Sequence, residues 1–389
     1  MTQTQELGAE EAKASSNGPV RIEPDLRFKT EMAEFGGTTF DRCYQCAACS
    51  TICELSTEAA PFPRKEMGWA QWGLKDRLVR DADLWRCHFC GECSERCPRG
   101  ADPGESMMAL RRWAISRYDW TGLSRKLYTS RAWELGTLLA VALVVVGLFA
   151  WSGAFSAERM ITTHVSMNTF IPVSQVHSAD WAMAGILAFF LLSNSWRMAR
   201  LMLDGQKIPL SVYLGQAMTF LLQFSVQRDW QRCAGEKIRW LKHLFLITGY
   251  ATMFALVMLF LDHLQVDSSE FTWVSLLGYY STVAIIYFSV DAIISRARKT
   301  KPIHRYSHDS DWMFLILLLL TGVSGIAVHA FRMMDLPMAT YVTYVAHLGI
   351  AVPMLVVEVP FMKWAHLMYR PLALYLRAAK MEARRIGAT

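Results

Sequence analysis

The chain has 389 residues, of which 53% are hydrophobic and only 19% carry a charge, and its formal net charge is +6. Long apolar runs separate the charged segments, which excludes an ordinary soluble protein. The positive charge suggests nucleic acid as a partner, but Lys and Arg flank the apolar runs and form no single basic face. We therefore expect membrane lipid around the protein and no nucleic-acid partner.

The first 24 residues are polar, and we expect them to be disordered. They contain no apolar core after a basic start, which argues against a secretory signal peptide. The amino terminus is therefore expected in the cytoplasm, where closely spaced cysteines bind metal more often than they form disulfides.

Eight of the nine cysteines lie in two runs with the same spacing, C-x2-C-x2-C-x3-C. This is the spacing of bacterial ferredoxins, in which the fourth cysteine of each run ligates the other of two [4Fe-4S] clusters. The spacing predicts one cluster on Cys43, Cys46, Cys49 and Cys97, and a second on Cys87, Cys90, Cys93 and Cys53. Structural zinc is disfavoured because zinc sites use two separated cysteine pairs, and disulfides are less favoured still. The ninth, Cys233, stands alone and is interpreted as structural.

The segment of about 33 residues between the two runs is too long for the hairpin of a compact bacterial ferredoxin. Within it, RKEMGWAQWGLKDRLV has the spacing of a helix. Residues 25–118 resemble the α-helical ferredoxin domain found in the C subunit of heterodisulfide reductase and in the iron–sulfur subunits of succinate and glycerol-3-phosphate dehydrogenases. The resemblance implies a two-step electron wire.

After a linker at residues 119–131, six apolar segments are each long enough to cross about 30 Å of hydrocarbon. They lie near residues 132–152, 179–201, 240–262, 273–294, 311–331 and 340–366. The connections after the second and fourth segments are rich in Lys and Arg, which places them and both termini in the cytoplasm. We expect an all-α protein of the inner membrane, with the spans in residues 132–370 and a basic cytoplasmic tail in residues 371–389.

Nine of the ten histidines fall in this membrane half, where ionisable side chains are usually functional. His243 starts the third segment and His366 ends the sixth, so the two lie at one level. His347 lies near the outer side, with His329 and His263 at about its level. Two imidazoles facing each other can bind a haem iron, so two levels predict two b-type haems. The alternative for a lone histidine is an interhelical hydrogen bond.

The last segment, AHLGIAVPMLVVEVPFMKWAHLMYRPLALY, resembles the final helix of the gamma chain of respiratory nitrate reductase and of its relative, the E subunit of heterodisulfide reductase. Two histidines with nearly this separation bind two haems in that family, which implies that His347 and His366 are ligands. RWLKHLFLITGYATMF resembles the partner helix, with His243 as the inner ligand. Met253 stands near the place of that helix's second histidine, so we assign His329, or as an alternative His263, to the outer haem.

A helical ferredoxin fused to such a cytochrome resembles the membrane C subunit of quinone-interacting membrane-bound oxidoreductases. The resemblance implies electron exchange between menaquinone and flavoproteins related to heterodisulfide reductase A, which work with adenylylsulfate reductase in sulfate respiration. No nucleotide or nucleophile motif is visible, so we expect an oxidoreductase subunit without its own active site for a soluble substrate. The alternatives are an anchor of another respiratory reductase and a membrane redox sensor.

Glu358 stands within the sixth segment, between the two predicted haem levels. A charge at that depth costs about 2.5 to 3.5 kcal/mol or more unless it is paired. The sequence therefore favours a neutral or hydrogen-bonded carboxyl group over a proton relay.

Overall fold

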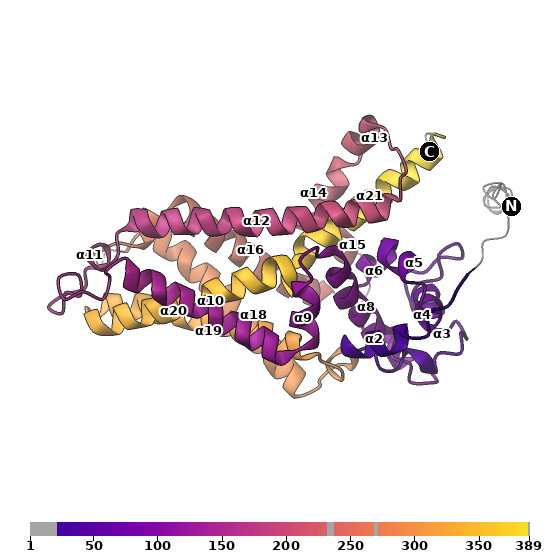
Figure 1. The fold of residues 1–389 in the computed structure, drawn as a ribbon, viewed down its shortest axis with the longest axis horizontal. Coiled ribbons are helices and arrows are strands. Elements are labelled where there is room, and N and C mark those ends of the chain that lie inside the picture. The colour runs from indigo at the N-terminus through magenta and orange to yellow at the C-terminus, as the bar shows by residue number, and fades with distance from the viewer. Residues whose placement is uncertain (1–21, 232–236, 268–270, 388–389) are drawn as a thin grey trace.

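The computed structural model describes residues 22–231, 237–267 and 271–387, and within these residues it contains helices and no strand (Figure 1). The predicted all-α fold is confirmed. Most of the segment predicted to be disordered, and Cys233, lie outside the described residues.

The amino-terminal part is a group of short helices around the two cysteine runs. They are α2 (Phe28–Glu34), η1 (Phe40–Arg42), α3 (Ala48–Ile52), α4 (Arg64–Gln71), α5 (Lys75–Arg80), α6 (Asp83–Arg86), α7 (Glu92–Glu95) and α8 (Pro103–Tyr118). Helix α8 forms the centre of this part, because Met107, Leu110 and Trp113 on it are fully buried. The helix predicted over RKEMGWAQWGLKDRLV is broken into α4 and α5 at Gly73, whose φ of +64° favours glycine.

Six helices are long and apolar enough to cross a membrane. They are α10 (Arg131–Trp151), α12 (Val173–Leu203), α16 (Lys237–Leu259), α18 (Trp273–Ala297), α19 (Asp309–Met333) and α20 (Pro337–Phe361). The six predicted segments are thus confirmed as helices, with ends that differ by a few residues. The predicted linker contains a helix of its own, α9 (Leu123–Thr129), and Ser130 caps α10 by accepting a hydrogen bond from the Trp133 amide.

Short helices fill the connections between the six long ones. They are α11 (Met167–Phe170), α13 (Leu210–Gly215), α14 (Ala217–Ser225), α15 (Arg228–Gln231), α17 (Leu261–Leu264) and η2 (Pro302–His304). Figure 1 shows α11 at the end of the bundle opposite the amino-terminal helices.

The last predicted segment does not run unbroken to His366. Helix α20 ends at Phe361, a short turn η3 (Lys363–Ala365) follows, and α21 (His366–Arg385) begins at the histidine. Pro360 cannot donate a backbone hydrogen bond, and the Lys363 amide donates to the Glu358 carboxylate at 3.1 Å. In a continuous helix the Lys363 amide would donate to a backbone carbonyl oxygen; here it donates to the Glu358 carboxylate instead.

Residues 371–385, predicted to be part of a basic tail, form most of α21. This helix buries Tyr369, Leu374, Leu376 and Ala379, and it packs against α12, α14 and α6. One apolar core therefore runs from the amino-terminal helices through α12 and α20 into α21.

Both ends of the described chain and the basic connections lie at the same end of the bundle as the amino-terminal helices (Figure 1). Arg80 of α5 binds Asp204, which follows α12, at 2.5 Å. Arg239 of α16 donates to the carbonyl oxygens of Phe89 at 2.8 Å and His88 at 3.0 Å. These contacts fix the cysteine-rich part against the bundle, while its cytoplasmic location stays a prediction.

Candidate iron–sulfur and haem sites

The first predicted cluster site is a small cavity between the two cysteine runs. Its lining includes the three leading cysteines of the first run and the last cysteine of the second: Cys43, Cys46, Cys49 and Cys97. Arg64 and Arg99 also line it, so two guanidinium groups stand beside a site that would hold an anionic cluster. The fold thus brings together the four thiols that the crossed pairing assigns to one cluster.

The second predicted cluster set likewise combines the last cysteine of one run, Cys53, with the three leading cysteines of the other run. Helix α3 of the first run packs against α7 of the second. Cys53 lies within electrostatic range of Cys87 and Cys90, and Cys93 lies within range of all three and also of Cys49 in the first set. All eight of these cysteines are free thiols.

The two cysteine loops share an unusual backbone geometry. Gln45 and Phe89 occupy equivalent positions after the first cysteine of each run, and their φ angles are +64° and +53°. Ala47 and Gly91 follow the second cysteines, with φ angles of +69° and +89°. A left-handed conformation costs a residue other than glycine roughly 1–2 kcal/mol. Its repetition at matched positions indicates that a shared function imposes it.

The chemistry of the thiols fits a metal cluster. Burial raises the pKa of Cys49 and of Cys53 to about 11 each, with neighbouring thiolates or backbone amides acting as smaller influences. Without a metal these buried sulfurs would remain protonated, whereas iron would replace the protons and compensate the thiolate charge. Backbone amides already point at two sulfurs: Phe89 donates to Cys87 Sγ at 3.3 Å, and Ala101 donates to Cys97 Sγ at 3.4 Å.

A neighbouring acidic group in the same domain is not a metal site. The carboxylates of Glu66, Asp81 and Asp83 lie close enough to share an ion. The Lys65 ammonium group already lies 3.2, 3.4 and 2.8 Å from them. Burial alone would lower the pKa of Lys65, but the three carboxylates outweigh it and raise that pKa. We therefore interpret the group as a structural ion cluster.

The structure brings His243 and His366 together, as the sequence predicted. Their ring centroids are 6.3 Å apart. Two imidazoles that bind one iron would have their ring centres about 6 Å apart, since each metal–nitrogen bond is about 2 Å long and each ring centre lies about 1 Å beyond its nitrogen. Nδ1 of His366 donates to the Lys363 carbonyl oxygen at 2.5 Å, which leaves Nε2 for a metal. The pair fits a haem with two histidine ligands.

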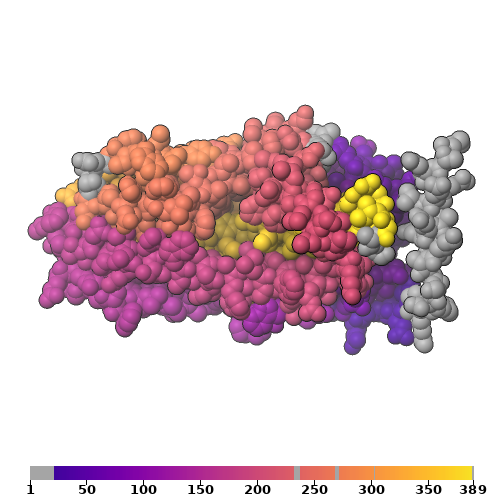
Figure 2. All heavy atoms as spheres, turned by 90° about the horizontal axis from the view of Figure 1, so that it is seen from above, coloured from indigo at the N-terminus to yellow at the C-terminus, as the bar shows by residue number. Residues whose placement is uncertain are grey.

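The surface of the bundle is hollowed beside α12 (Figure 2). Figure 2 shows a hollow between α12 and the segments of α14 and α16, with the yellow C-terminal segment on its floor. The start of α12 contacts the end of α16: His177 Nε2 lies 3.0 Å from the Met258 carbonyl oxygen. The surface is thus hollowed over part of the C-terminal segment (Figure 2).

A row of rings joins the second cysteine run to the histidine pair. His88, between Cys87 and Cys90, stacks on Trp230 with the ring centroids 5.7 Å apart. Trp230 lies 5.1 Å from the ring of His243. Arg370 of α21 contacts the His88 ring and donates to the Arg86 carbonyl oxygen at 3.3 Å. Burial, and after it the charge of Arg370, holds the pKa of His88 well below its usual value, so this imidazole is neutral.

The outer histidines are arranged less simply. His347 Nδ1 contacts Ser324 Oγ at 2.9 Å, which leaves its other ring nitrogen for a metal. His329 contacts the Tyr279 hydroxyl at 2.6 Å through Nε2 and Arg332 at 3.1 Å through Nδ1. His263 is exposed on α17, beside Phe260 and Trp273. The outer pairing stays a prediction, and His329 would have to release one contact to serve as a ligand.

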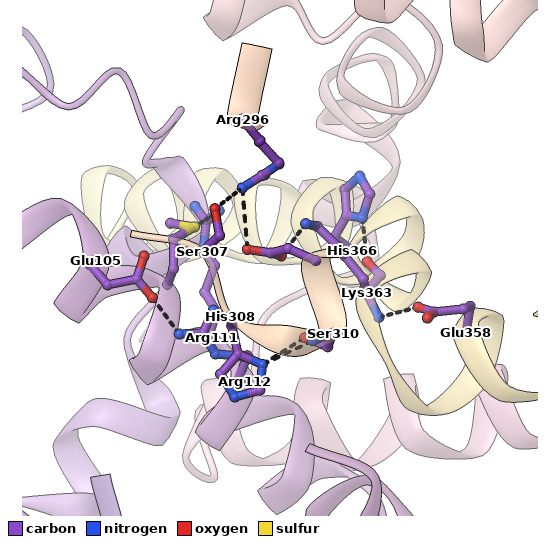
Figure 3. Close-up of polar contacts among 12 residues, drawn as sticks. Glu105, Arg111, Arg112, Arg296, Ser307, His308, Ser310, Glu358, Lys363 and His366 are labelled. Carbon is purple, nitrogen blue, oxygen red and sulfur yellow. Dashed lines mark hydrogen bonds and ion pairs between the residues drawn. The ribbon is translucent and has the colours of Figure 1, made fainter. Parts of the chain in front are cut away.

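A buried ionic network next to His366 was not identified from the sequence (Figure 3). Lys363 Nζ binds Asp311, which is 9% exposed in the first turn of α19. Arg296 lies 3.7 Å from the other Asp311 oxygen and donates to Ser307 Oγ at 2.8 Å. The available signal was that Asp311 and Lys363 are opposite charges inside two segments predicted to span the membrane.

Nearby, Arg112 of α8 binds Glu105 at 2.5 Å and the Phe35 carbonyl oxygen at 2.8 Å (Figure 3). Burial raises the pKa of Glu105, and Arg112 only partly opposes this effect. The ring of His308, which precedes α19, lies 6.4 Å from that of Tyr128. Polar groups of the cysteine-rich part and of the bundle therefore meet close to the His366 site.

Comparisons with known proteins identify the cysteine-rich part. A family model described as a 4Fe-4S dicluster domain matches residues 39–101. A protein of Archaeoglobus profundus described as like the C subunit of heterodisulfide reductase is 35% identical over 97 residues, which cover 25% of this chain and 52% of the relative. The iron-sulfur C subunit of the CoB–CoM heterodisulfide reductase of Methanopyrus kandleri is 31% identical over 104 residues, covering 25% and 53%.

A third relative is the C subunit of the H2:CoB-CoM heterodisulfide,ferredoxin reductase of Methanothermobacter marburgensis. It is 35% identical over 75 residues, which cover 19% of this chain and 40% of that protein. The chain therefore spans about half the length, or less, of the curated relatives it matches. No solved structure matches the chain. The amino-terminal part is thus a 4Fe-4S dicluster domain similar to the C subunit of heterodisulfide reductase, and six helices able to span a membrane follow it.

Proposed function

We propose that the protein is a membrane electron-transfer subunit that exchanges electrons between menaquinone and soluble flavoprotein partners. Its cofactors would be two [4Fe-4S] clusters on the two crossed cysteine sets and two b haems. The inner haem would use His243 and His366, and the outer haem would use His347 with His329 or His263. When bound, these groups supply one-electron carriers that can accept the two electrons of a quinol in turn.

The observation that carries the proposal is the row of rings between the two kinds of site. The centroids of His88, Trp230, His243 and His366 follow one another at 5.7, 5.1 and 6.3 Å. Arg239 and Arg370 hold the cysteine loop in place by binding its backbone and the His88 ring. The chain thereby fixes a thiol set of the dicluster domain against a histidine pair of the bundle.

The first cysteine cavity suits contact with a soluble partner. Cys46 is exposed, and Tyr44 beside it is 58% exposed. Figure 1 shows α3, which carries Cys49, towards the end of the molecule away from the long helices. We propose that flavoproteins related to heterodisulfide reductase A dock here, and that adenylylsulfate reductase takes part in the same sulfate-respiration chain.

The proposal is tested by adding a menaquinol analogue to the purified full chain and recording its visible spectrum. We expect haem bands that sharpen on reduction by the analogue. Haem bands that do not respond would refute the quinone role, and a spectrum without haem bands would refute the cytochrome assignment.

A second candidate function is an anchor that delivers quinol electrons to another reductase. The printed names of the relatives favour it, since they describe subunits of heterodisulfide reductases. The proteins that copurify with the chain distinguish the two candidates. A flavoprotein with adenylylsulfate reductase supports the first, and a catalytic subunit of another reductase supports the second.

A further inference from the structure

Two carboxyl groups are buried at the ferredoxin end of the bundle without full hydrogen bonding. Glu134, in the first turn of α10, is 2% exposed, and Glu358, in the last turn of α20, is 1% exposed. Within the described chain, Oε1 of each carboxyl group has no hydrogen-bond partner, and the same holds for the hydroxyl group of Tyr250 on α16. Burying such groups unpaired is costly, so these atoms indicate a proton or water that completes the set.

The three groups lie in the same region of the bundle. Helix α10 packs along α20, and Glu358 lies within electrostatic range of both Glu134 and Tyr250. The titratable and charged groups that face Glu358 come from five elements: Tyr128 of α9, Glu134 of α10, Tyr250 of α16, Asp311 of α19 and Lys363 of η3.

Lys363 is the cation that faces Glu358, but its ammonium group is already bound by Asp311. Arg131 is the cation that faces Glu134, and it is bound by Asp309 at 2.5 Å. Among the described residues, Glu358 accepts a hydrogen bond only from the backbone amide of Lys363, through Oε2. Two carboxylates near each other in a medium of low dielectric constant cannot both be ionised without a large cost. The pair of Glu134 and Glu358 is therefore suited to hold one proton, and the affinity for this proton should depend on the charge at the neighbouring His366 site.

The main chain of Lys363 joins this site to the inner histidine pair (Figure 3). Its amide donates to Glu358 at 3.1 Å, and its carbonyl oxygen accepts from His366 Nδ1 at 2.5 Å. An electron that arrives beside His366 adds one negative charge to a buried region. A proton taken up by Glu358 would cancel that charge at short range.

We propose that Glu358, with Glu134 and Tyr250, is a proton-binding site linked to the oxidation state of the His243–His366 centre. With haem bound by this pair, uptake of one electron by the iron would be accompanied by uptake of one proton, which converts the Glu358 carboxylate to the carboxylic acid; oxidation would release both. The electron comes from a quinol or from the soluble partner, and the proton comes from water at the ferredoxin end of the bundle. The inference rests on the proposed function, because it requires haem at this pair.

The test is a redox titration of the full chain in detergent, followed through the haem bands between about pH 6 and pH 9, where buried carboxyl groups have been found to titrate. We expect the midpoint potential of the inner haem to fall by about 59 mV for each unit rise in pH, which is a tenfold change in the equilibrium constant of its one-electron reduction. Glu358→Gln should make the potential independent of pH, whereas Glu358→Asp, which keeps a carboxyl group, should retain the slope. A slope that persists in Glu358→Gln would overturn the inference.

An infrared difference spectrum gives a second readout. Reduction should produce the C=O stretch of a protonated carboxyl group, and Glu358→Gln should abolish this band. If Glu358→Gln does not fold, Glu134→Gln is used in its place. Removing the charge that faces Glu358 should move the pH range over which the midpoint potential changes to lower pH. An unchanged plot of midpoint potential against pH would overturn the pairing of the two carboxyl groups. Haem with a pH-independent potential refutes only this inference, whereas a chain without haem refutes the proposed function as well.

Discussion

The crossing of ligands between the two cysteine runs gives a sharp test of the iron–sulfur sites. Cys97 belongs to the second run, yet it lines a cavity with Cys43, Cys46 and Cys49. Cys97→Ser should therefore damage the same cluster as Cys46→Ser. We expect either substitution to lower the iron bound to sulfur from about eight to about four atoms per chain, since each cubane holds four.

Low-temperature electron paramagnetic resonance of the reduced protein, with iron analysis, identifies the cluster that is lost. The double variant Cys46→Ser/Cys97→Ser should keep about four cluster irons and one signal, because both substitutions affect one cluster. Cys46→Ser/Cys53→Ser should lose both signals, because each substitution affects a different cluster. If Cys97→Ser instead reproduced the spectrum of Cys90→Ser, each cluster would use one run alone and the crossed pairing would be refuted.

Three further predictions concern stability and the outer haem. Lys65→Met leaves the carboxylates of buried Glu66 and Asp83 and of partly buried Asp81 without their shared cation. We expect the free energy of unfolding to fall by about 3–5 kcal/mol, measured by denaturant unfolding, and an unchanged midpoint would contradict this. Burial lowers the pKa of His308 from 6.5 to about 4. Between these two pH values the unfolded chain binds more protons than the folded chain, so the free energy of unfolding falls as the pH falls. His308→Gln should flatten this pH dependence, measured by denaturant unfolding. A Cβ on Gly325 would lie 3.2 Å from the His347 ring, so Gly325→Leu should reduce haem from about two to about one per chain, while Gly147→Leu, in open space, should retain both.

The features predicted well from the sequence are those that local patterns encode. The two cysteine runs carry their spacing within short segments, and this spacing predicted the 4Fe-4S dicluster domain. The crossed pairing of the ligands stays a prediction. The six apolar segments are equally local, because membrane thickness fixes their length. The meeting of His243 and His366 followed from their positions at matching ends of two such segments.

The features that were missed depend on contacts between distant residues. The end of α20 at Phe361 reflects a side chain, Glu358, that takes the Lys363 amide in place of a backbone carbonyl. The predicted tail forms α21 because the faces of α12 and α14 bury its apolar residues. Trp230 showed no signal in the sequence, since its role depends on the positions of His88 and His243 on either side of it.

The same limit applies to Glu358. The sequence showed a carboxyl group in an apolar segment and favoured a neutral or hydrogen-bonded state over a proton relay. The structure supplies the hydrogen bond to Lys363, and it also shows Oε1 unpaired and Glu134 nearby. The proximity of a second carboxyl group on α10 favours proton exchange, and nothing within residues 340–366 indicates it.

The central claim is that iron held by the cysteines and iron held by His243 and His366 belong to one electron path. The most direct measurement is rapid-freeze paramagnetic resonance combined with visible spectroscopy on the full chain, after mixing with a menaquinol analogue. The account predicts that the haem bands are reduced first and that the cluster signals then appear in the same sample, more slowly in Trp230→Leu than in the unmodified chain. The contradicting result is that the quinol analogue reduces the haem but the clusters stay oxidised at equilibrium. Dithionite must then be shown to reduce the clusters at a potential that the quinol can reach.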